Sequence, residues 1–498
     1  MTVLRPHASG EAEAPKDTGF GPALVLMAGR VLASAVTFLI PVVLARAFDQ
    51  HLFGDYKRLF LVYATLWSLG QVGMAESLYY FLPHHPDKAG RLLMNAAAML
   101  AVSGAAVAIV LAIAAGPVAA FLGNPEVAPY VPLLGAYLSI MLVTSVLEVA
   151  MVSRRRFTWA AATYVGTDIL RAVTLVVPVV AGFGLRGLLM GAIASAVMRL
   201  LAVVWYLRKE FPADLRPDGP LLRAQLAYAL PFALAMAVEI AQSSFHQYFV
   251  SYRVDAATFA LYAVGCLQIP IVDFLAGPAC NLMMVRIGEG RRLGDAGRVV
   301  AAFEDTTRKL ALFFFPLFSF MVVAATDLIV FLYTPQYAAS GAIFRLWCVA
   351  VLIAVFQTDG AVRALAQTRL LLVLNVIRLV FIAVLIGPML SAFGLVGPVL
   401  VTLIASAGAK VVMLLRWKTH VGVPFGELLP WGGLLRIAVA AAFASFASAT
   451  VLATLAQPML TRLAAATMVH AAVYVALLLG LGALTTGERH ALTFRRAA

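Results

Sequence analysis

The stretch LLLVLNVIRLVFIAVLIGPML, residues 370–390, decides the fold. Arg378 is its one charged residue, and a helix that crosses a bilayer needs about 20 consecutive apolar residues. In lipid every backbone N–H and C=O must be satisfied within the segment, and the alternating pattern of a transmembrane β-barrel strand is absent here. The stretch therefore predicts a transmembrane α-helix.

The rest of the chain has the same character. Of its 498 residues 62% are apolar and only 12% are charged, with a mean hydropathy of +0.93. Three soluble domains of this total length would need about twice as many charges to cover their surfaces. We therefore expect an all-α polytopic membrane protein with about fourteen transmembrane helices. The apolar runs lie near 21–46, 58–83, 92–122, 130–152, 159–182, 186–208, 225–250, 257–285, 307–333, 341–363, 370–390, 394–416, 431–456 and 460–484.

The positive charges are distributed unequally between the predicted loops. When the loops are numbered in chain order, the even loops hold twenty Lys and Arg residues. The odd loops hold six, which are Arg46, Lys57, Arg58, Arg186, Arg253 and Arg462. Loops rich in Lys and Arg stay in the cytoplasm, so this bias places the even loops and both termini there. The net charge of +13 then records topology and gives no reason to expect a nucleic-acid partner.

Two short patterns recur at a long interval. Phe53-Gly-Asp-Tyr56 is followed 206 residues later by Phe259-Ala-Leu-Tyr262, and Phe183-Gly-Leu-Arg-Gly187 is followed 210 residues later by Phe393-Gly-Leu-Val-Gly397. Two similar offsets in the same order predict two six-helix halves of equal orientation. The expected organisation is a cytoplasmic tail (1–20), a six-helix bundle (21–208), a cytoplasmic linker (209–224), a second bundle (225–416), two further helices (431–484) and a cytoplasmic tail (485–498).

No motif for enzyme chemistry is present in the sequence. There is no GxxxxGK[ST], HExxH or GxSxG, and Cys266, Cys280 and Cys348 form no metal-binding pattern. We therefore expect no catalytic residue, metal or cofactor. A membrane-embedded polymerase or ligase is disfavoured, because no odd loop is long enough for chemistry on the outer face.

Three arginines are predicted near the middle of spans, namely Arg30, Arg171 and Arg378. A charge at mid-bilayer is costly, so it should face a partner or a wet cavity, and guanidinium suits a phosphate or diphosphate. Asp168 lies three residues before Arg171, so it either neutralises this arginine within the helix or tunes it in a lumen. Arg199, Arg345 and Arg436 lie nearer span ends, where we expect their side chains to snorkel.

The seventh span carries Glu239, Gln242, Ser243 and His246 on one helical face. This stripe faces either a water-filled cavity, which we favour, or polar groups of neighbouring helices. Asp273 lies between Pro270 and Pro278 in the eighth span, where a kink frees carbonyl groups or serves packing. The candidate substrate-binding residues are Arg30, Arg171, Arg378, Gln242, Ser243 and His246, and the candidate ion-coupling residues are Glu239, Asp168, Asp273 and Glu76.

Several segments together resemble a known family. They are Ala45-Arg46 through Phe53-Gly-Asp-Tyr56, Gly70-Gln-Val-Gly-Met74, the two Phe-Gly-Leu repeats, and Leu332-Tyr-Thr-Pro-Gln-Tyr337 followed by Ala342-Ile-Phe-Arg345. Over roughly residues 20–420 the chain resembles the Wzx-type polysaccharide-biosynthesis flippases of the multidrug/oligosaccharidyl-lipid/polysaccharide exporter superfamily.

The resemblance implies a MATE-like fold of two six-helix bundles around a V-shaped cavity. It implies translocation of an undecaprenyl-diphosphate-linked oligosaccharide from the cytoplasmic to the periplasmic leaflet of a bacterial inner membrane, for O-antigen, exopolysaccharide or capsule. Alternating access coupled to H⁺ or Na⁺ is the implied mechanism, with polysaccharide polymerase or chain-length proteins as partners. A cation-coupled multidrug exporter of the same fold and a flippase for another lipid-linked precursor remain the alternatives.

Overall fold

The computed structural model describes residues 20–154, 156–212, 214–484 and 488, and within these residues every regular element is helical. In this part of the chain thirteen helices are long and apolar enough to cross a membrane. The predicted span 58–83 falls on α2 (Gln50–Gly70) and α3 (Met74–His84), and the predicted span 257–285 is interrupted between α11 (Ala256–Gly265) and α12 (Pro270–Arg292). These findings confirm the prediction of an all-α multi-pass membrane protein. The predicted tails, 1–20 and 485–498, lie outside the described residues except for Phe20 and Glu488.

The first half of the chain forms one bundle. Its helices are α1 (Phe20–Ala47), α2 (Gln50–Gly70), α3 (Met74–His84), α4 (Ala89–Ile113), α5 (Ala115–Phe121), α6 (Val131–Thr144), α7 (Val146–Ser153), α8 (Phe157–Val180) and α9 (Gly184–Glu210). α1 packs against α8, α4 against α6, and α9 against both α6 and α8.

The second half forms a similar bundle with two helices added. It comprises α10 (Gly219–Arg253), α11 (Ala256–Gly265), α12 (Pro270–Arg292), α13 (Ala296–Leu332), α14 (Ser340–Trp347), α15 (Val349–Ala354), α16 (Thr358–Ala364), α17 (Thr368–Phe393) and α18 (Val396–Val421), then α19 (Trp431–Thr454) and α20 (Met459–Gly480). The added pair packs on α13. α10 follows the predicted linker and contacts α3, α4 and α17, so it touches both bundles.

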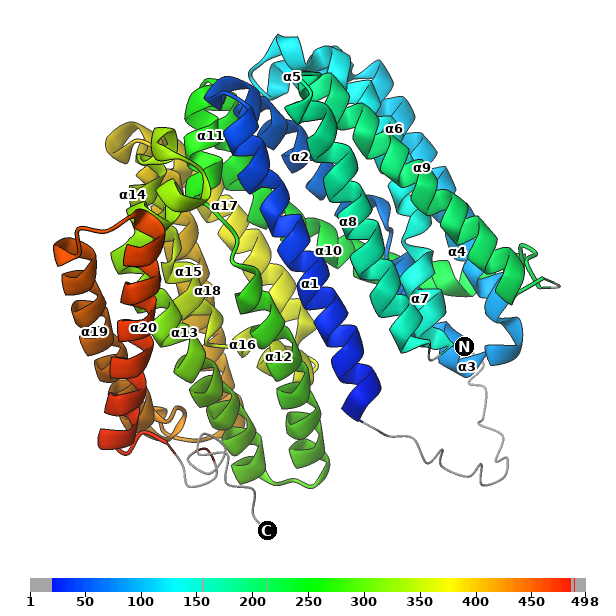
Figure 1. Ribbon diagram of the computed structural model, residues 1–498. Helices are drawn as coiled ribbons and strands as arrows, with labels where there is room; N and C mark the ends of the chain where they lie inside the picture. The colour runs from blue at the N-terminus through cyan, green and yellow to red at the C-terminus, as the bar shows by residue number, and fades with distance from the viewer. Residues whose placement is uncertain (1–19, 155, 213, 485–487, 489–498) are drawn as a thin grey trace.

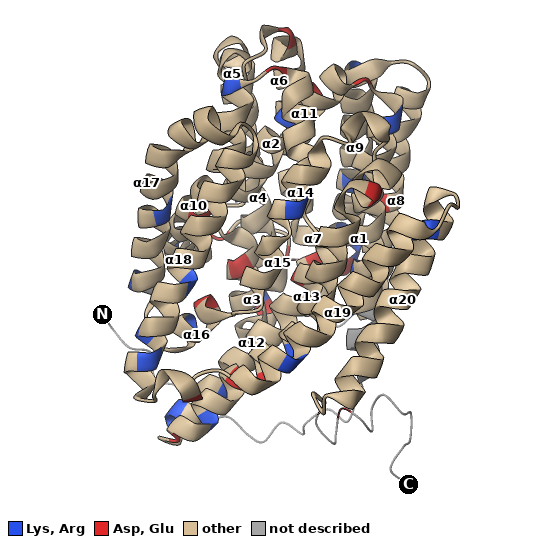
Figure 2. Ribbon diagram, turned by 90° about the vertical axis from the view of Figure 1, so that its left-hand side faces the viewer, with Lys and Arg blue, Asp and Glu red and all other residues tan. Residues whose placement is uncertain are grey.

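The two bundles lie side by side, and their helices run between two ends of the molecule (Figure 1). We call the end where α1 begins and α20 ends the proximal end, and the opposite end the distal end. Charged positions gather at the proximal ends of α12, α13 and α18, and others lie deep between the ends (Figure 2). The loops rich in Lys and Arg, which the sequence predicts to be cytoplasmic, therefore lie at the proximal end.

The repeat found in the sequence has a structural counterpart in α2 and α11. Asp49 caps the N-terminus of α2 by accepting a hydrogen bond from the Leu52 N–H at 2.7 Å. Asp255, 206 residues later, caps α11 in the same way through the Thr258 N–H at 2.9 Å. Each cap satisfies an orphan donor of a helix start. Asp255 lies in the connection before α11, and its side-chain and backbone hydrogen bonds from Thr258 lower its pKa.

These two equivalent helices pack against each other where the bundles meet at the distal end. The approach is closest at Gly54, because a Cβ at this position would lie 1.9 Å from the carbonyl oxygen of Ala256. No side chain fits at that distance, so the absence of a Cβ at Gly54 is a condition for the contact. The crossing of α2 and α11 therefore depends on one glycine.

Two arginines of the first bundle complete the distal contact by capping helices of the second. Arg46 donates to the carbonyl of Phe331 at 2.6 Å and to that of Leu332 at 3.3 Å, at the end of α13. Arg58 is fully buried in α2 and donates to the carbonyls of Ser251 and Val254 at the end of α10, at 3.0 and 2.6 Å. The last carbonyls of a helix lack partners and favour cations, so both arginines stabilise the closed distal end.

Substitution of Gly54 by alanine should open the distal end. The added Cβ requires the backbones of α2 and α11 to separate by about 1.5 Å to reach ordinary contact. Spin labels at Glu126 and Ala338, which are exposed on the two distal surfaces, should report longer distances in Gly54→Ala than in the parent after the three native cysteines are replaced. Gly116→Ala is the matched control, because nothing lies within 4 Å of its added Cβ. Equal distance distributions in both variants would refute the role of the crossing.

Candidate functional site

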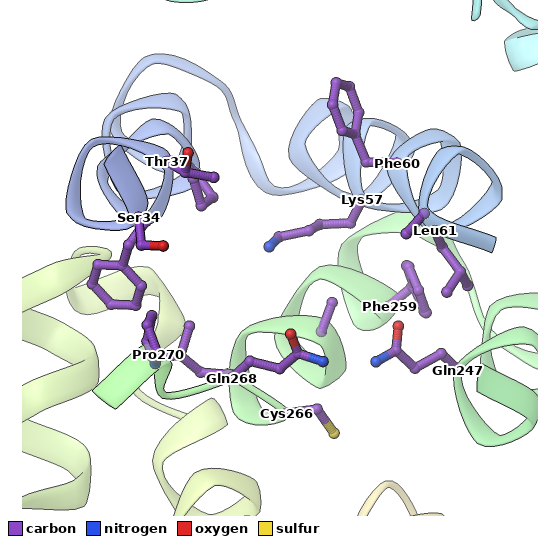
Figure 3. A pocket seen from close by; sticks show the side chains of 15 residues that line it. Ser34, Thr37, Lys57, Phe60, Leu61, Gln247, Phe259, Cys266, Gln268 and Pro270 are labelled. Atoms are coloured by element: carbon purple, nitrogen blue, oxygen red, sulfur yellow. The ribbon is translucent and has the colours of Figure 1, made fainter. Parts of the chain in front are cut away.

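A cavity of about 410 Å³ lies between the bundles, next to the crossing of α2 and α11. We call it the central cavity. It is bounded by α1, α2, α10, α11 and the start of α12 (Figure 3). Its polar lining residues are Ser34, Thr37, Lys57, Gln247 and Gln268, and the rest of the lining is mainly apolar.

Lys57 is the one charged residue among those that line the central cavity. Its side chain extends toward Ser34, while Gln247 and Gln268 point toward one another across the space (Figure 3). The ammonium lies 5.4 Å from the ring centre of Phe53 and 5.9 Å from that of Tyr56. Among the described residues it has no hydrogen-bonding or ion-pair partner. An ammonium that is removed from bulk water and has no hydrogen-bonding partner can gain strongly from an anionic ligand.

Equivalent positions of the two repeats supply matching walls of the central cavity. With the 206-residue offset, Phe60 corresponds to Cys266 and Leu61 to Leu267, and all four residues line the cavity. Lys57 corresponds to Ala263, which lines it as well. The central cavity is thus built around the pseudosymmetric contact of the bundles. Its charge is not symmetric, because Lys57 has an uncharged counterpart, Ala263, in the second repeat.

A second cavity, of about 560 Å³, lies within the second bundle between α12, α14–α16, α17 and α18. We call it the C-bundle cavity. It is lined by charged residues of both signs, by amide side chains and by one tryptophan: Asp273, Asp359, Arg363, Arg378, Lys410, Asn281, Gln357 and Trp347. A third cavity, of about 620 Å³ between α13 and α20, is lined mainly by apolar residues.

The charges of the C-bundle cavity are only partly paired. Lys410 forms an ion pair with Asp359. Arg378 donates to Ser406 Oγ at 2.8 Å and to Asn375 Oδ1 at 3.3 Å, and its Nε atom is buried without a partner. Within the described chain the side chains of Asp273 and Arg363 form no hydrogen bond or ion pair. This cavity therefore offers unused donors and one unused carboxylate.

Interrupted helices border the central cavity and the C-bundle cavity, which we call the two polar cavities because charged and amide side chains line them. α11 ends at Gly265 and α12 begins at Pro270, and the segment between them lines the central cavity. α15 ends at Ala354 and α16 begins at Thr358, next to the C-bundle cavity. Irregular backbone at membrane depth is tolerated where it lines a polar cavity or is buried in protein. Both interruptions therefore support the assignment of these cavities as polar sites.

The predicted arginines do not gather in one place. Arg30 donates to the hydroxyl of Tyr164 at 3.2 Å and lines neither of these two cavities. Arg171 pairs with Asp168 at 2.9 Å and donates to Thr37 Oγ1 at 2.6 Å. Because Thr37 lines the central cavity, Arg171 supports its wall, and the predicted pairing with Asp168 is present. Arg378 lies instead in the C-bundle cavity.

The predicted polar stripe of α10 is mostly turned away from both polar cavities. Gln242 and His246 are buried, and His246 shares a 2.6 Å hydrogen bond with the hydroxyl of Tyr262. The hydroxyl of Ser243 donates to the Ile240 carbonyl within its own helix. Glu239 and Glu76 are half-buried and line neither polar cavity, whereas Asp273 lines the second. The roles predicted for these residues remain predictions.

The sequence did not single out several residues of the polar sites. Lys57 was placed in a loop because span 2 was predicted to begin at residue 58, whereas α2 begins at Gln50. Arg363 and Lys410 fall within the predicted spans 341–363 and 394–416, and nothing in the sequence singles them out. Glu148 was missed, and it pairs with Arg199, so the prediction that Arg199 snorkels is wrong. The signal available in the sequence was the single acidic residue in the span near 130–152.

The fold defines a multi-pass membrane protein with two cavities lined by charged and amide side chains. A family model described as "Polysaccharide biosynthesis protein" matches residues 43–342, and the chain belongs to this family. A comparison with curated proteins finds no match.

Solved structures share the fold. The lipid II flippase MurJ in its inward closed conformation is similar with a TM-score of 0.71 and 12% identity, over 92% of this chain and 98% of that chain. A multidrug/oligosaccharidyl-lipid/polysaccharide (MOP) superfamily transporter from Pyrococcus furiosus has a TM-score of 0.59 and 14% identity, over 80% and 94%. An inward-facing MATE-family multidrug resistance transporter has a TM-score of 0.59 and 15% identity, over the same shares. The expected superfamily fold is confirmed.

Glu148→Gln should destabilise the first bundle, because it leaves the guanidinium of Arg199 without its carboxylate. The two side chains are only 10% and 14% exposed, and breaking such a buried pair costs about 3–5 kcal/mol. The melting temperature of the purified protein measures this loss. Asp305→Asn is the control, since its carboxylate is 36% exposed and an exposed pair contributes at most about 1 kcal/mol. Equal melting temperatures of the two variants would contradict the structural role of the pair.

Proposed function

We propose that this protein translocates a lipid-linked saccharide across a bacterial inner membrane, with both termini in the cytoplasm. The substrate is an undecaprenyl-diphosphate-linked oligosaccharide destined for O-antigen, exopolysaccharide or capsule. Membership of the polysaccharide biosynthesis family supports the pathway, and the flippase-like fold supports movement across the bilayer. The polar head group needs a path through about 30 Å of hydrocarbon, whereas a polyprenyl tail can stay in lipid.

The single observation that carries this proposal is the unpaired Lys57 in the central cavity. An ammonium is a compact donor of three hydrogen bonds and a common ligand of phosphate oxygens. Ser34, Thr37, Gln247 and Gln268 add neutral donors around it. The cavity therefore suits a diphosphate at the junction between lipid and glycan.

The arrangement of the bundles fits one stage of alternating access. At the distal end the bundles are held together by Gly54, Arg46 and Arg58. If the proximal end faces the cytoplasm, as the charge bias predicts, this closed distal end faces the periplasm. A substrate would then enter from the cytoplasmic side and leave after the distal contacts have opened. Coupling of this change to H⁺ or Na⁺ stays part of the proposal.

The same observation disfavours the alternative of a multidrug exporter for cationic compounds. Such a substrate would meet the ammonium of Lys57, and no carboxylate is among the residues that line the central cavity. Like charges in a cavity of low polarity repel strongly. A flippase for another lipid-linked diphosphate precursor would use the same site and differs in the glycan alone.

Lys57→Gln should reduce translocation while the protein still folds. Loss of a charge-assisted hydrogen bond to a diphosphate costs about 1.5–3 kcal/mol, or roughly a 10–100-fold loss of affinity. Surface glycan in a deletion strain carrying each variant is the measurement, together with the amount of lipid-linked repeat unit on the cytoplasmic leaflet. Lys209→Gln is the matched control, because Lys209 is exposed near the end of α9 and lines neither polar cavity.

The deletion strain itself tests the function as a whole. We expect it to lose surface glycan and to accumulate lipid-linked repeat units. Normal surface glycan in the deletion strain, accompanied by altered drug resistance, would overturn the proposal in favour of a drug exporter.

A further inference from the structure

The C-bundle cavity has a chemistry that a diphosphate site does not require. It contains acceptors, in Asp273, the amide of Asn281 and that of Gln357, next to the guanidinium donors of Arg363 and Arg378. A bare phosphate site would exclude an unpaired carboxylate such as Asp273, because like charges repel. The mixture therefore points to a ligand with many hydroxyl groups, each of which both donates and accepts.

Trp347 strengthens this interpretation. It lines the cavity, and its ring packs against the imidazole of His246 with ring centres 5.4 Å apart. A flat apolar ring fixed in this way beside hydrogen-bonding groups offers a surface to the C–H face of a sugar ring. The volume of about 560 Å³ lies within the usual range for small-molecule sites.

The balance of charge indicates which kind of sugar. Asp359 and Lys410 neutralise one another as an ion pair. The charged lining residues left are the two arginines, Arg363 and Arg378, against Asp273, and the carboxylate of Glu239 on α10 also lies within electrostatic reach of Arg378. A guanidinium suits a planar carboxylate because it offers forked N–H donors that stay charged. The cavity therefore favours a sugar that carries an acid group.

The cavity is also correctly placed to receive the glycan of a substrate held in the central cavity. Pro270 lines the central cavity and Asp273 lines the C-bundle cavity. Both belong to the first turn of α12, so about 5 Å of helix separates the two residues along the axis. The two cavities therefore adjoin at this turn, as a diphosphate and its attached sugars would require.

We propose that the C-bundle cavity is a saccharide subsite that binds a carboxylate-bearing sugar of the translocated glycan, with Arg363 and Arg378 receiving the carboxylate and Trp347 stacking on the ring. This inference rests on the proposed function, because it assumes that a glycan enters the protein. It adds a substrate class, an acidic oligosaccharide, and a second binding region to that function.

The test measures binding of soluble probes to the full-length protein in lipid nanodiscs by titration calorimetry. Digalacturonate represents the acidic sugar, and galactobiose is its neutral counterpart. Undecaprenyl diphosphate probes the central cavity independently. We expect digalacturonate to bind at least tenfold more tightly than galactobiose, and Arg378→Gln to weaken digalacturonate about tenfold while affecting undecaprenyl diphosphate far less.

Arg369→Gln is the matched control for this variant. Arg369 lies on the same helix, α17, but it is exposed near its start and does not line the cavity. Its substitution removes the same charge and should leave the affinity for digalacturonate unchanged. Melting temperatures show whether each variant is folded, and Arg378→Lys, which keeps the charge, should recover part of the affinity if Arg378→Gln folds poorly.

The outcomes separate the two proposals. Equal affinities for digalacturonate and galactobiose, or equal losses in Arg378→Gln and Arg369→Gln, would overturn the acidic subsite even if undecaprenyl diphosphate binds. Absence of undecaprenyl diphosphate binding, combined with specific binding of digalacturonate, would instead overturn the diphosphate site and leave the saccharide subsite standing.

Discussion

The contact between α2 and α11 at Gly54 is the constraint on which the rest of the structure depends. A Cβ there would lie 1.9 Å from the Ala256 carbonyl oxygen, so the two bundles can meet this closely only over a glycine. The crossing fixes the distal closure, and the central cavity lies directly beside it because residues of the next turns of both helices form its walls. One backbone contact thus determines both where the bundles are joined and where a substrate can be held.

The three cations of the first predicted odd loop show why this contact between the bundles could not be recognised in the sequence. Arg46 and Arg58 cap the ends of α13 and α10 from the opposite bundle, and Lys57 faces the central cavity. In a count of loop charges these residues were exceptions to the cytoplasmic bias. In the structure Arg46 and Arg58 bind helix-end carbonyls of the other bundle and Lys57 lines the central cavity, so these three departures from the topology rule mark residues at the junction of the bundles.

Most of the fold could be predicted because long apolar runs and the positive-inside bias are strong physical signals. The duplication could be predicted as well, since the Phe53 and Phe259 segments begin helices with the same Asp cap. The site was harder to predict, because the sequence of an apolar helix says little about which of its faces points into a cavity. Gln242 of the α10 stripe is buried, while Gln247, five residues on, lines the cavity. Lys57 was not predicted as a cavity residue, because the second span was predicted to begin at residue 58, eight residues after the start of α2 at Gln50.

The central claim is that Lys57 holds the diphosphate of a lipid-linked saccharide between the two bundles. A cryo-electron microscopy map of the full-length protein in nanodiscs with an undecaprenyl-diphosphate-linked sugar tests it most directly. The account predicts diphosphate density in the central cavity with an oxygen within about 3 Å of Lys57 Nζ. Diphosphate density bound elsewhere, with an empty central cavity, would contradict it.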